Sequence, residues 1–452
     1  MFKRVLVANR GEVAVRVIRA LHENDVEAVA VYSTADRDSL HVRLADRAVC
    51  VGPPQATESY LRIPSLIAAA TTTGCEAVHP GWGFLAESPA FVEACADNDL
   101  VFVGPSAQTM ARMGDKVQAK AELRAADVPL VPGTEEATSL DEARAAAEDV
   151  GYPVLLKAAA GGGGKGMRLV EGPDELEAAY STAALEAEAA FGDGSLYLEK
   201  AISPARHVEI QVLADGRGGV LTLGERDCSV QRRHQKLIEE SPSPALTPET
   251  REEMESAAER ACHAIDYRSA GTFEFLLGPD RSFYFIELNA RLQVEHPVSE
   301  LVTGIDVVRE QLRIASGEAL TRTGRAERRG HALEVRLNAE DPRRDFVPSP
   351  GRITRFQPPL GPGIRLDTWI EDGAEVPPHY DSLLGKLIVW DETRPEALAR
   401  SLRALGELRL EGVPTTRELA IDILRSEEFA SGRYSTRFLD EAGPRLPALA
   451  RS

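Results

Sequence analysis

The stretch from Phe285 to Glu295 alternates apolar and polar residues, and its polar half consists of side chains that can bind ions. Successive side chains of an extended strand point to opposite faces, so the alternation predicts one apolar and one polar face. The predicted polar face carries two carboxylates, two carboxamides and one guanidinium: Glu287, Asn289, Arg291, Gln293 and Glu295. Such a row could hold a cation and an oxyanion side by side. An ordinary amphipathic surface strand is the alternative, and only further anion- and metal-binding features elsewhere in the chain decide against it.

A hairpin supplies one of these features. Gly278-Pro279-Asp280 separates two predicted strands, residues 271–277 and 283–288. With the turn centred between Asp280 and Arg281, Glu274 would lie directly across from Glu287. Facing carboxylates repel unless a cation lies between them, and oxygen ligands together with nucleotide phosphates suit Mg²⁺. We therefore predict a metal site at Glu274 and Glu287, with Asn289 as a candidate third ligand; a one-residue shift in register would remove this argument.

A glycine-rich loop, residues 161–166 (GGGGKG), lies between two predicted strands. A Walker loop would lead from a strand into a helix and end in Lys-Ser or Lys-Thr, whereas here Gly166 follows Lys165. Each glycine costs about 0.5–1 kcal/mol of ordering free energy relative to Ala in regular structure. The bare N–H groups of such a loop suit a flap that closes over phosphates. Lys157 and Lys165 favour this interpretation over a hairpin tip without function.

The densest basic segment runs from Arg226 to Lys236 (RDCSVQRRHQK). In an acidic chain it indicates a local anion site rather than a nucleic-acid surface, which needs a broader basic face. Cys228 is expected to be a packed thiol, because no base can be assigned to it. His207 and His234 are ambiguous from the sequence alone.

The bulk properties exclude several classes of protein. The chain has 452 residues, enough for two or three domains, and a formal net charge of −19, which disfavours nucleic-acid and anionic-membrane binding. No apolar run approaches the ~20 residues of a membrane span, and no N-terminal signal pattern precedes the first predicted strand. The five cysteines have no paired spacing. They are interpreted as reduced thiols of a cytoplasmic protein, with no zinc site.

The element pattern divides the chain into three parts. Residues 1–112 alternate short apolar strands and helices, which is typical of a parallel α/β sheet. Their first strand–helix turn, residues 8–12, lacks the three-glycine dinucleotide fingerprint, which argues against a nicotinamide site. Residues 113–316 mix helices with strands around the glycine loop. From about residue 330 a second polar-faced strand (331–338), a Pro/Gly-rich connector, a strand near 386–390 and helices follow.

Taken together, these features resemble biotin carboxylase, an ATP-grasp enzyme or subunit of acetyl-CoA, propionyl-CoA and pyruvate carboxylases. The resemblance covers nearly the whole chain. It is carried by these motifs: VLVANRGEVAVRVIRA near the start, HPGWGFLAE at 79–87, MGDK at 113–116, KAAAGGGGKGMR at 157–168, RHVEIQV at 206–212, ERDCSVQRRHQK at 225–236, FIELNARLQVEHPVSE at 285–300, EVRLNAEDP at 334–342 and YDSLLGKL at 380–387.

The resemblance implies an α/β and α+β architecture in three domains: a Rossmann-like parallel α/β domain at 1–112, an ATP-grasp domain at 113–316 with a lid at about 130–202, and a mixed α/β domain at 330–445. It implies carboxylation of biotin by ATP and bicarbonate, through carboxyphosphate, as the first half-reaction of an acyl-CoA carboxylase. Mg²⁺ or Mn²⁺ would serve as metal. The chain would form a homodimer, and its partners would be a biotin carboxyl carrier protein and a carboxyltransferase subunit. No Met-Lys-Met setting occurs in the chain, so the carrier is expected on a separate polypeptide.

The resemblance also assigns roles to individual residues. Glu274 and Glu287, with Asn289 as a candidate, would bind the metal. Glu295 would remove the bicarbonate proton and Arg336 would stabilise the biotin enolate. Lys236, Arg291, Gln293 and the backbone at Val294 would hold bicarbonate. The ATP site would comprise Lys116, Lys157, Gly161, Gly162, Gly163, Gly164, Lys165, Gly166, Glu199, Lys200, His207, Gln231, His234 and Leu276.

Two positions depart from the family pattern. Trp82 replaces the usual Tyr, which puts a hydroxyl contact near biotin in doubt, although an indole N–H could substitute. Lys165 stands where some relatives carry Arg, and little change is expected there.

Two other functions are compatible with parts of the pattern. One is a ligase of the same fold that joins another carboxylate to an amine through an acyl phosphate, which a substrate screen would separate. The other is a non-catalytic nucleotide-binding scaffold. A degenerate scaffold should have lost one metal carboxylate, and both are present.

Overall fold

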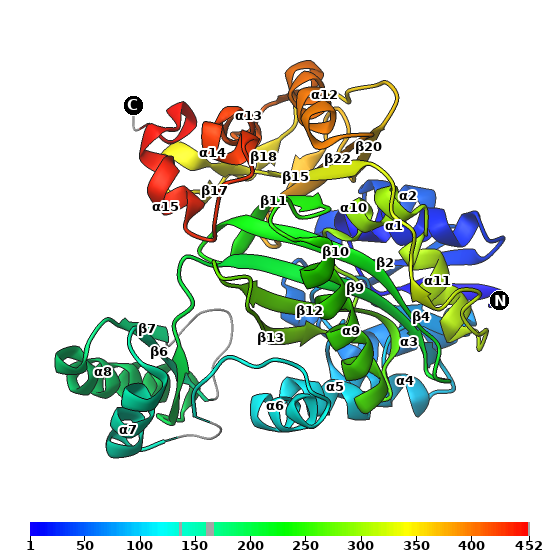
Figure 1. Ribbon diagram of the computed structural model, residues 1–452. Helices are drawn as coiled ribbons and strands as arrows, with labels where there is room; N and C mark the ends of the chain where they lie inside the picture. The colour runs from blue at the N-terminus through cyan, green and yellow to red at the C-terminus, as the bar shows by residue number, and fades with distance from the viewer. Residues whose placement is uncertain (135–137, 160–166, 451–452) are drawn as a thin grey trace.

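The computed structural model describes residues 1–134, 138–159 and 167–450 (Figure 1). Its N-terminal part is a parallel sheet with the strand order β3-β2-β1-β4-β5. The elements are β1 (Arg4–Val7), α1 (Gly11–His22), β2 (Glu27–Ser33), a 3₁₀ turn (Thr34–Asp36), α2 (Leu40–Leu44), β3 (Arg47–Gly52), a second 3₁₀ turn (Ala56–Glu58), α3 (Ile63–Thr73), β4 (Ala77–His79), α4 (Pro89–Ala96) and β5 (Val101–Phe102). The predicted parallel α/β arrangement is confirmed.

Both faces of the inner strands β1, β2 and β4 are covered, whereas the edge strand β3 is largely exposed. Helix α1 packs on the face formed by Val5, Val7 and Ala28, and helices α3 and α4 pack on the face formed by Leu6 and Val29. Strands buried on both sides have no solvent face, which is why they appear in the sequence as uninterrupted apolar runs.

Two helices, α5 (Ala107–Gly114) and α6 (Lys116–Ala125), lead to a small separate layer that we call the lid. Figure 1 shows the lid standing away from the body at lower left. Its antiparallel strand order is β7-β6-β8, and α7 and α8 share an apolar core with these strands. The elements are α7 (Leu140–Val150), β6 (Val154–Ala158), β7 (Met167–Val170), α8 (Pro173–Phe191) and β8 (Leu196–Lys200). A β-bridge between Leu130 and Phe285 fixes the chain to the body just before the lid.

A large sheet forms the centre of the body, with the strand order β13-β12-β9-β10-β11-β15-β22-β20 and with β14 paired to β10. The elements up to residue 325 are β9 (Arg206–Asp215), β10 (Val220–Arg232), β11 (Gln235–Ser241), α9 (Pro248–Ala264), β12 (Arg268–Leu277), β13 (Phe283–Asn289), α10 (His296–Thr303), α11 (Val307–Ala315) and β14 (Gly324–Arg325). The predicted hairpin is confirmed, and β10 is a long strand that runs to Arg232.

The C-terminal part contributes strands to the same sheet, because β15 pairs with β11. Its elements are β15 (His331–Asn338), β16 (Glu340–Asp341), a 3₁₀ turn (Pro342–Arg344), β17 (Val347–Pro348), β18 (Gly351–Arg352), β19 (Arg355–Gln357), β20 (Ile364–Thr368), β21 (Glu375–Val376), β22 (Leu383–Asp391), α12 (Arg394–Glu407), β23 (Arg409–Glu411), α13 (Arg417–Arg425), α14 (Glu427–Ala430), α15 (Phe438–Ala442) and two 3₁₀ turns (Gly443–Arg445, Pro447–Leu449). The polar-faced strand predicted at 331–338 therefore lies beside the polar residues of β11.

The prediction of a strand over Phe285–Glu295 is wrong beyond Asn289. Strand β13 ends there, and the backbone N–H of Ala290 donates to the Glu87 carboxylate at 3.0 Å instead of to a neighbouring strand. The alternation continues through a bent segment whose polar side chains turn inward. Asn289, Gln293 and Glu295 are all buried.

The register of the hairpin places Glu274 directly opposite Glu287, as predicted. The route to this register differs from the prediction. At the tip Leu277 pairs with Phe283, which centres the turn on Asp280, and a bulge between Glu274 and Phe275 then shifts the pairing by one residue. Bulges of this kind redirect side chains next to functional sites.

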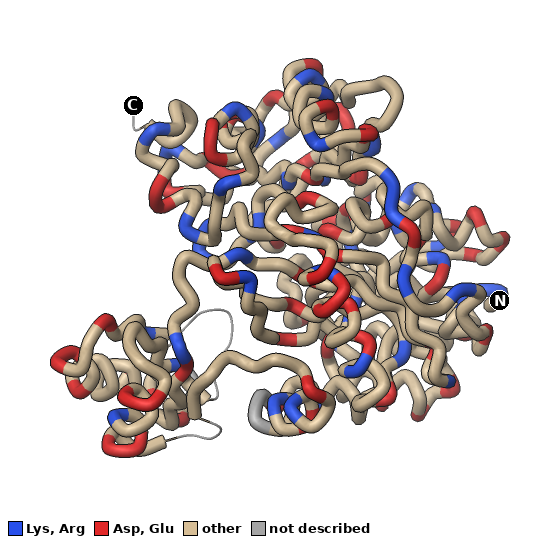
Figure 2. Tube along the Cα trace, in the orientation of Figure 1, with Lys and Arg blue, Asp and Glu red and all other residues tan. Residues whose placement is uncertain are grey.

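Basic and acidic residues are intermixed along the chain. Blue basic and red acidic segments alternate through the body, the lid and the C-terminal helices in Figure 2. Among the helices of the described residues, none combines the length and apolar character that a membrane crossing requires.

Glu240 on β11 joins the central sheet to the C-terminal helices. Its buried carboxylate accepts hydrogen bonds from His331 Nε2 at 2.6 Å, from Arg394 Nε at 2.7 Å and from the Tyr434 hydroxyl. Burial by itself would raise the pKa of Glu240, but the hydrogen bonds and charges of His331 and Arg394 outweigh it and lower this pKa to about 2.

We expect Glu240→Gln to lower the free energy of unfolding by about 3–5 kcal/mol, because it leaves the partly buried guanidinium of Arg394 without its anion. The folded pKa lies below the unfolded value of 4.5, so the stabilisation is present above about pH 4.5 and is lost as the pH falls toward about 2. Apparent melting temperatures should therefore differ most at neutral pH and converge in acid. Glu427→Gln, in an exposed ion pair with Arg433, is the control and should change little; an equally large fall there would contradict the assignment.

Candidate active site

The polar centre of the molecule is built around the ammonium group of Lys236 on β11. Its Nζ donates to Glu295 Oε1 at 2.5 Å, to Glu209 Oε2 at 2.6 Å and to Glu274 Oε1 at 3.0 Å. Lys236 and these carboxylates are buried. Burial by itself would lower the pKa of Lys236, but the surrounding acidic groups raise it well above its ordinary value. The cluster therefore keeps Lys236 charged.

Arg336 on β15 forms the second cationic contact of Glu295. Its Nη2 donates to Glu295 Oε2 at 2.9 Å and its Nε donates to Glu239 Oε1 at 2.6 Å. Burial acts to raise the pKa of Glu295, but Lys236 and Arg336 outweigh it and hold this pKa well below the ordinary value. Burial raises the pKa of Glu239 to about 7, despite Arg336. Two carboxylates on one arginine thus have opposite pKa shifts, an arrangement typical of active sites.

Glu274 collects further donors from the end of β13 and the segment that follows it. Asn289 Nδ2 donates to Glu274 Oε1 at 2.8 Å and Gln293 Nε2 does so at 3.3 Å. His207 Nε2 lies 3.0 Å from Glu274 Oε2. The bent segment thereby brings two of the residues predicted from the alternation against the predicted metal carboxylate.

Arg291 lies at the outer side of this cluster. It donates to Glu87 Oε2 at 2.9 Å, to Asn289 Oδ1 at 2.8 Å and to Gln293 Oε1 at 3.1 Å. All of the polar residues predicted from Asn289 to Glu295 are therefore brought together, although the chain beyond Asn289 is not a strand.

The predicted metal ligands fit a hard cation in their chemistry. Glu274 and Glu287 are cross-strand partners, and Asn289 follows two residues after Glu287. Glu274 is buried, whereas Glu287 is exposed. Two other groups of potential ligand atoms occur among the described residues, His207, Glu209 and Glu274, and Glu209, Cys228 and Glu295; within each group the atoms lie within 4.8 Å of one another. Lys236 is bonded to Glu209, Glu274 and Glu295. The oxygen donors of Glu274, Glu287 and Asn289 are consistent with a cation that binds there together with nucleotide phosphates.

The residues predicted to bind ATP come from several elements. In the lid, Lys157 on β6 forms an ion pair with Glu199 on β8, and Lys120 of α6 donates to the same carboxylate at 2.6 Å. Lys200 instead donates to the lid carbonyls of Gly151 and Tyr152 at 2.8 and 2.9 Å, so its ammonium faces backbone rather than an open site.

The other predicted ATP residues lie on the central sheet or outside the described residues. Leu276 on β12 is the register partner of His207 on β9. Gln231 on β10 is the register partner of Lys236, and His234 lies exposed in the β10–β11 turn. Gly161, Gly162, Gly163, Gly164, Lys165 and Gly166 lie outside the described residues, as does the side chain of Lys116.

The basic segment 226–236 is not one anion site, contrary to the sequence prediction. Arg226 is fully buried and donates to Glu209 Oε1 at 2.6 Å and to Gln211 Oε1 at 2.7 Å. It therefore compensates the negative charge of Glu209. Arg232 pairs with Asp345 at 2.6 Å, away from the cluster. Residues on a strand point to opposite faces in turn, which separates neighbours in the sequence; Lys236 alone of this segment's cations contacts Glu274 and Glu295 within the described residues. Cys228 is buried, as expected for a packed thiol.

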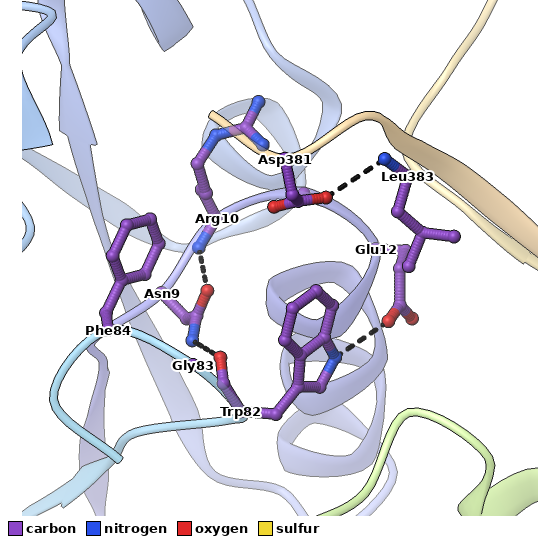
Figure 3. A pocket seen from close by; sticks show the side chains of 9 residues that line it. Asn9, Arg10, Glu12, Trp82, Gly83, Phe84, Asp381 and Leu383 are labelled. Atoms are coloured by element: carbon purple, nitrogen blue, oxygen red, sulfur yellow. Dashed lines mark hydrogen bonds between the residues drawn. The ribbon is translucent and has the colours of Figure 1, made fainter. Parts of the chain in front are cut away.

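A cavity of about 230 Å³ opens beside the first strand–helix turn. It is lined by Asn9, Arg10, Gly11, Glu12, Trp82, Gly83, Phe84, Asp381 and Leu383 (Figure 3). The indole N–H of Trp82 donates to Glu12 Oε1 at 2.9 Å, and Asn9 holds the Trp82 carbonyl at 2.8 Å. The donor that could have replaced a tyrosine hydroxyl is therefore already engaged within the protein.

Sequence reasoning missed several members of the cluster. Glu209 shares a face of β9 with His207 and Gln211, so the same polar alternation that singled out the later segment was present in HVEIQ. Glu239 on β11 and Glu87 after β4 carry no such local signal. Their contacts span 97 and 204 residues of sequence.

Comparisons with known proteins identify one family. Residues 1–110 match the family model described as biotin carboxylase, N-terminal domain. Residues 115–323 match carbamoyl-phosphate synthase L chain, ATP binding domain, and residues 334–441 match biotin carboxylase C-terminal domain.

Individual relatives cover almost the whole chain. It is 51% identical over 442 residues to a biotin carboxylase of Nostoc sp., covering 97% of this chain and 99% of the relative. It is 52% identical over 444 residues to that of Pseudomonas aeruginosa, covering 98% of each.

Two solved structures show the same fold. One is a biotin carboxylase complex from Campylobacter jejuni described as containing beta-gamma-ATP, with a TM-score of 0.93, 46% identity and coverage of 98% of this chain and 99% of that one. The other is the biotin carboxylase domain dimer of the Hydrogenobacter thermophilus 2-oxoglutarate carboxylase, solved with MgADP, ADP and bicarbonate, with a TM-score of 0.92, 44% identity and coverage of 100% and 99%. The chain therefore belongs to the biotin carboxylase family of ATP-dependent ligases.

Proposed function

We propose that this protein uses ATP and bicarbonate to carboxylate biotin that is attached to a separate carrier protein. The observation that carries the proposal is the position of Lys236 Nζ, 2.5 Å from Glu295 and 3.0 Å from Glu274. One cation joins the carboxylate proposed as base to a carboxylate proposed as metal ligand. The relative solved with MgADP and bicarbonate supports this interpretation.

For ATP, the proposed contacts come from the lid and the central sheet. Lys157 and Glu199 would act from the lid, and His207 and Leu276 from β9 and β12. Lys116, Lys200, Gln231, His234 and the loop from Gly161 to Gly166 are proposed from the family resemblance. Glu274, Glu287 and Asn289 would hold Mg²⁺ or Mn²⁺, which when bound would neutralise phosphate charge. The protein then contributes positioning and fixed electrostatic stabilisation.

Bicarbonate would lie against Lys236, Arg291, Gln293 and the backbone N–H of Val294, with Glu295 as the base. In the present arrangement both oxygens of Glu295 accept hydrogen bonds from cations. A carboxylate held in this way is a weak base, because those cations lower its pKa. Exchange of one cation for the substrate hydroxyl would raise the pKa of Glu295 at the moment when the proton is transferred.

The bicarbonate oxygen then attacks the γ-phosphorus of ATP, which releases ADP and forms carboxyphosphate. Carboxyphosphate breaks into CO₂ and phosphate, and the phosphate takes the ureido N1 proton of biotin. The resulting enolate attacks CO₂ to give carboxybiotin. Arg336 would stabilise the enolate, since its guanidinium lies 2.9 Å from Glu295 and is fixed on its other side by Glu239.

We further propose an acyl-CoA as the final acceptor, reached through a carboxyltransferase partner, and a homodimer as the working form. The relative solved as a domain dimer supports the homodimer. A relative from Methanothermobacter thermautotrophicus, named as part of a pyruvate carboxylase, is 49% identical over 443 residues. Co-purification of the native complex distinguishes these acceptors.

The test of the proposed function is ATP cleavage by the purified chain with free biotin and Mg²⁺. We expect ADP release to require bicarbonate and to rise when biotin is added. Turnover that does not depend on bicarbonate would contradict the proposal. Stimulation by a different carboxylate together with an amine would support the alternative ligase function instead.

A further inference from the structure

The segment Gln293-Val294-Glu295 is held from below by two buried side chains that donate to its carbonyl groups. His296 Nδ1 lies 2.7 Å from the Gln293 carbonyl. Lys386 Nζ on β22 donates to the Val294 carbonyl at 2.7 Å. Both side chains are fully inaccessible to solvent. Two consecutive peptide groups next to the proposed base are therefore fixed by side chains.

Fixing a carbonyl also fixes the N–H on the other side of the same peptide. The peptide group is planar and trans, so its C=O and N–H point in opposite directions. The bond from His296 thus orients the N–H of Val294, and the bond from Lys386 orients the N–H of Glu295. Among the hydrogen bonds of the described residues, neither N–H has an acceptor. Val294 and Glu295 are buried, where unpaired N–H groups are rare.

The ring of His296 has a defined protonation state. The Gln293 carbonyl can only accept, so Nδ1 must carry the hydrogen. Among the described residues Nε2 has no hydrogen-bond partner, and a carboxylate oxygen of Glu300 lies 3.9 Å from it. Burial holds the pKa of His296 well below its ordinary value. The ring is therefore neutral, with the proton on Nδ1.

Lys386 is held in place by Glu12, which lines the cavity drawn in Figure 3. Its Nζ lies 3.2 Å from Glu12 Oε2, and Glu12 Oε1 accepts the indole N–H of Trp82. In the sheet, Lys386 is the register partner of Arg336. These contacts connect the cavity wall, through Glu12 and Lys386, to the peptide beside Glu295.

We propose that His296 and Lys386 are positioning residues that orient the N–H groups of Val294 and Glu295 as donors to the bicarbonate anion. The proposal rests on the proposed function, in which bicarbonate lies against this segment. Successive N–H groups held in this way form an anion-binding concavity. Neither side chain touches the substrate, and each acts through the backbone.

The first test distinguishes the effect of the hydrogen-bond donor of His296 from the effect of its side-chain volume. His296→Leu removes the donor, whereas His296→Asn keeps an N–H at nearly the position of Nδ1. We expect His296→Leu to raise the KM for bicarbonate by about tenfold or more, with the KM for ATP unchanged within about twofold. His296→Asn should restore most of the loss. His41→Leu is the control, because His41 is a buried histidine bonded to the Val31 carbonyl in the N-terminal sheet; it should leave the KM for bicarbonate unchanged.

Lys386→Met, which keeps the aliphatic stem, should raise the KM for bicarbonate in the same selective way. ¹⁵N NMR of the histidine rings in the wild-type protein provides a readout that does not depend on activity. His296 should show a protonated Nδ1 and an unprotonated Nε2 across about pH 6–8.

The outcomes are distinguishable. Wild-type ATP cleavage that does not require bicarbonate would overturn the proposed function. Bicarbonate-dependent cleavage by the wild type, together with an unchanged KM for bicarbonate in His296→Leu and Lys386→Met, would overturn the positioning role alone. An unprotonated Nδ1 on His296 would also overturn it, because the bond to the Gln293 carbonyl needs that hydrogen.

Discussion

Glu295→Gln is expected to lower kcat for bicarbonate-dependent ATP cleavage by about 10²–10⁴-fold, while the Kd for ATP stays unchanged. The substitution keeps the shape of the side chain but removes the carboxylate that would accept the bicarbonate proton. Steady-state ADP release and nucleotide binding by calorimetry measure the two effects separately.

The matched control for this substitution is Glu252→Gln. Glu252 pairs with Arg325 at the surface, with 66% of its side chain exposed, and its loss should not change kcat. If Glu295→Gln turns over at a rate near that of the wild type, Glu295 is not the base.

Lys236→Met is expected to have the second large effect, on both activity and stability. It removes the cation to which Glu209, Glu274 and Glu295 are all bonded. We expect turnover to fall by more than about 10³-fold, because the charge that would face bicarbonate is lost. Unfolding free energy should fall by about 3–5 kcal/mol, the usual cost of leaving buried charges unpaired.

The pH dependence of this variant has a definite sign. Without Lys236 the remaining carboxylates repel one another, so their folded pKa values rise above the unfolded value. The loss of unfolding free energy caused by this repulsion is then absent at low pH, where the carboxylates are protonated, and grows as the pH rises. The stability of Lys236→Met should therefore be closest to that of the wild type in mild acid. Apparent melting temperatures across this range measure the effect. Lys236→Arg, which keeps the charge, should be less destabilised at neutral pH; a pH-independent deficit in Lys236→Met would contradict the cluster as described.

Much of the fold was predictable because its signals are local. Uninterrupted apolar runs in the first 112 residues predicted parallel strands, since strands covered on both faces need no polar side. The turn at Gly278-Pro279-Asp280 predicted the hairpin, which the structure confirms. The end of β13 at Asn289 was not predictable in the same way. A carboxylate from residue 87 takes the N–H of Ala290, and that contact depends on how distant segments pack.

By itself, the sequence determined many of the chemical groups that the site contains and the family to which the chain belongs. The polar alternation at 285–295 identified Asn289, Arg291, Gln293 and Glu295, and all of them meet in the structure. Only the tertiary structure decided their partners. It placed Lys236 among three carboxylates, buried Arg226 beneath them, and set His296 and Lys386 against the backbone of the same segment. The sequence signals of strands and turns extend over a few residues, whereas these contacts join strands that are far apart in the chain. The position of each strand in the sheet is fixed only when the whole core packs.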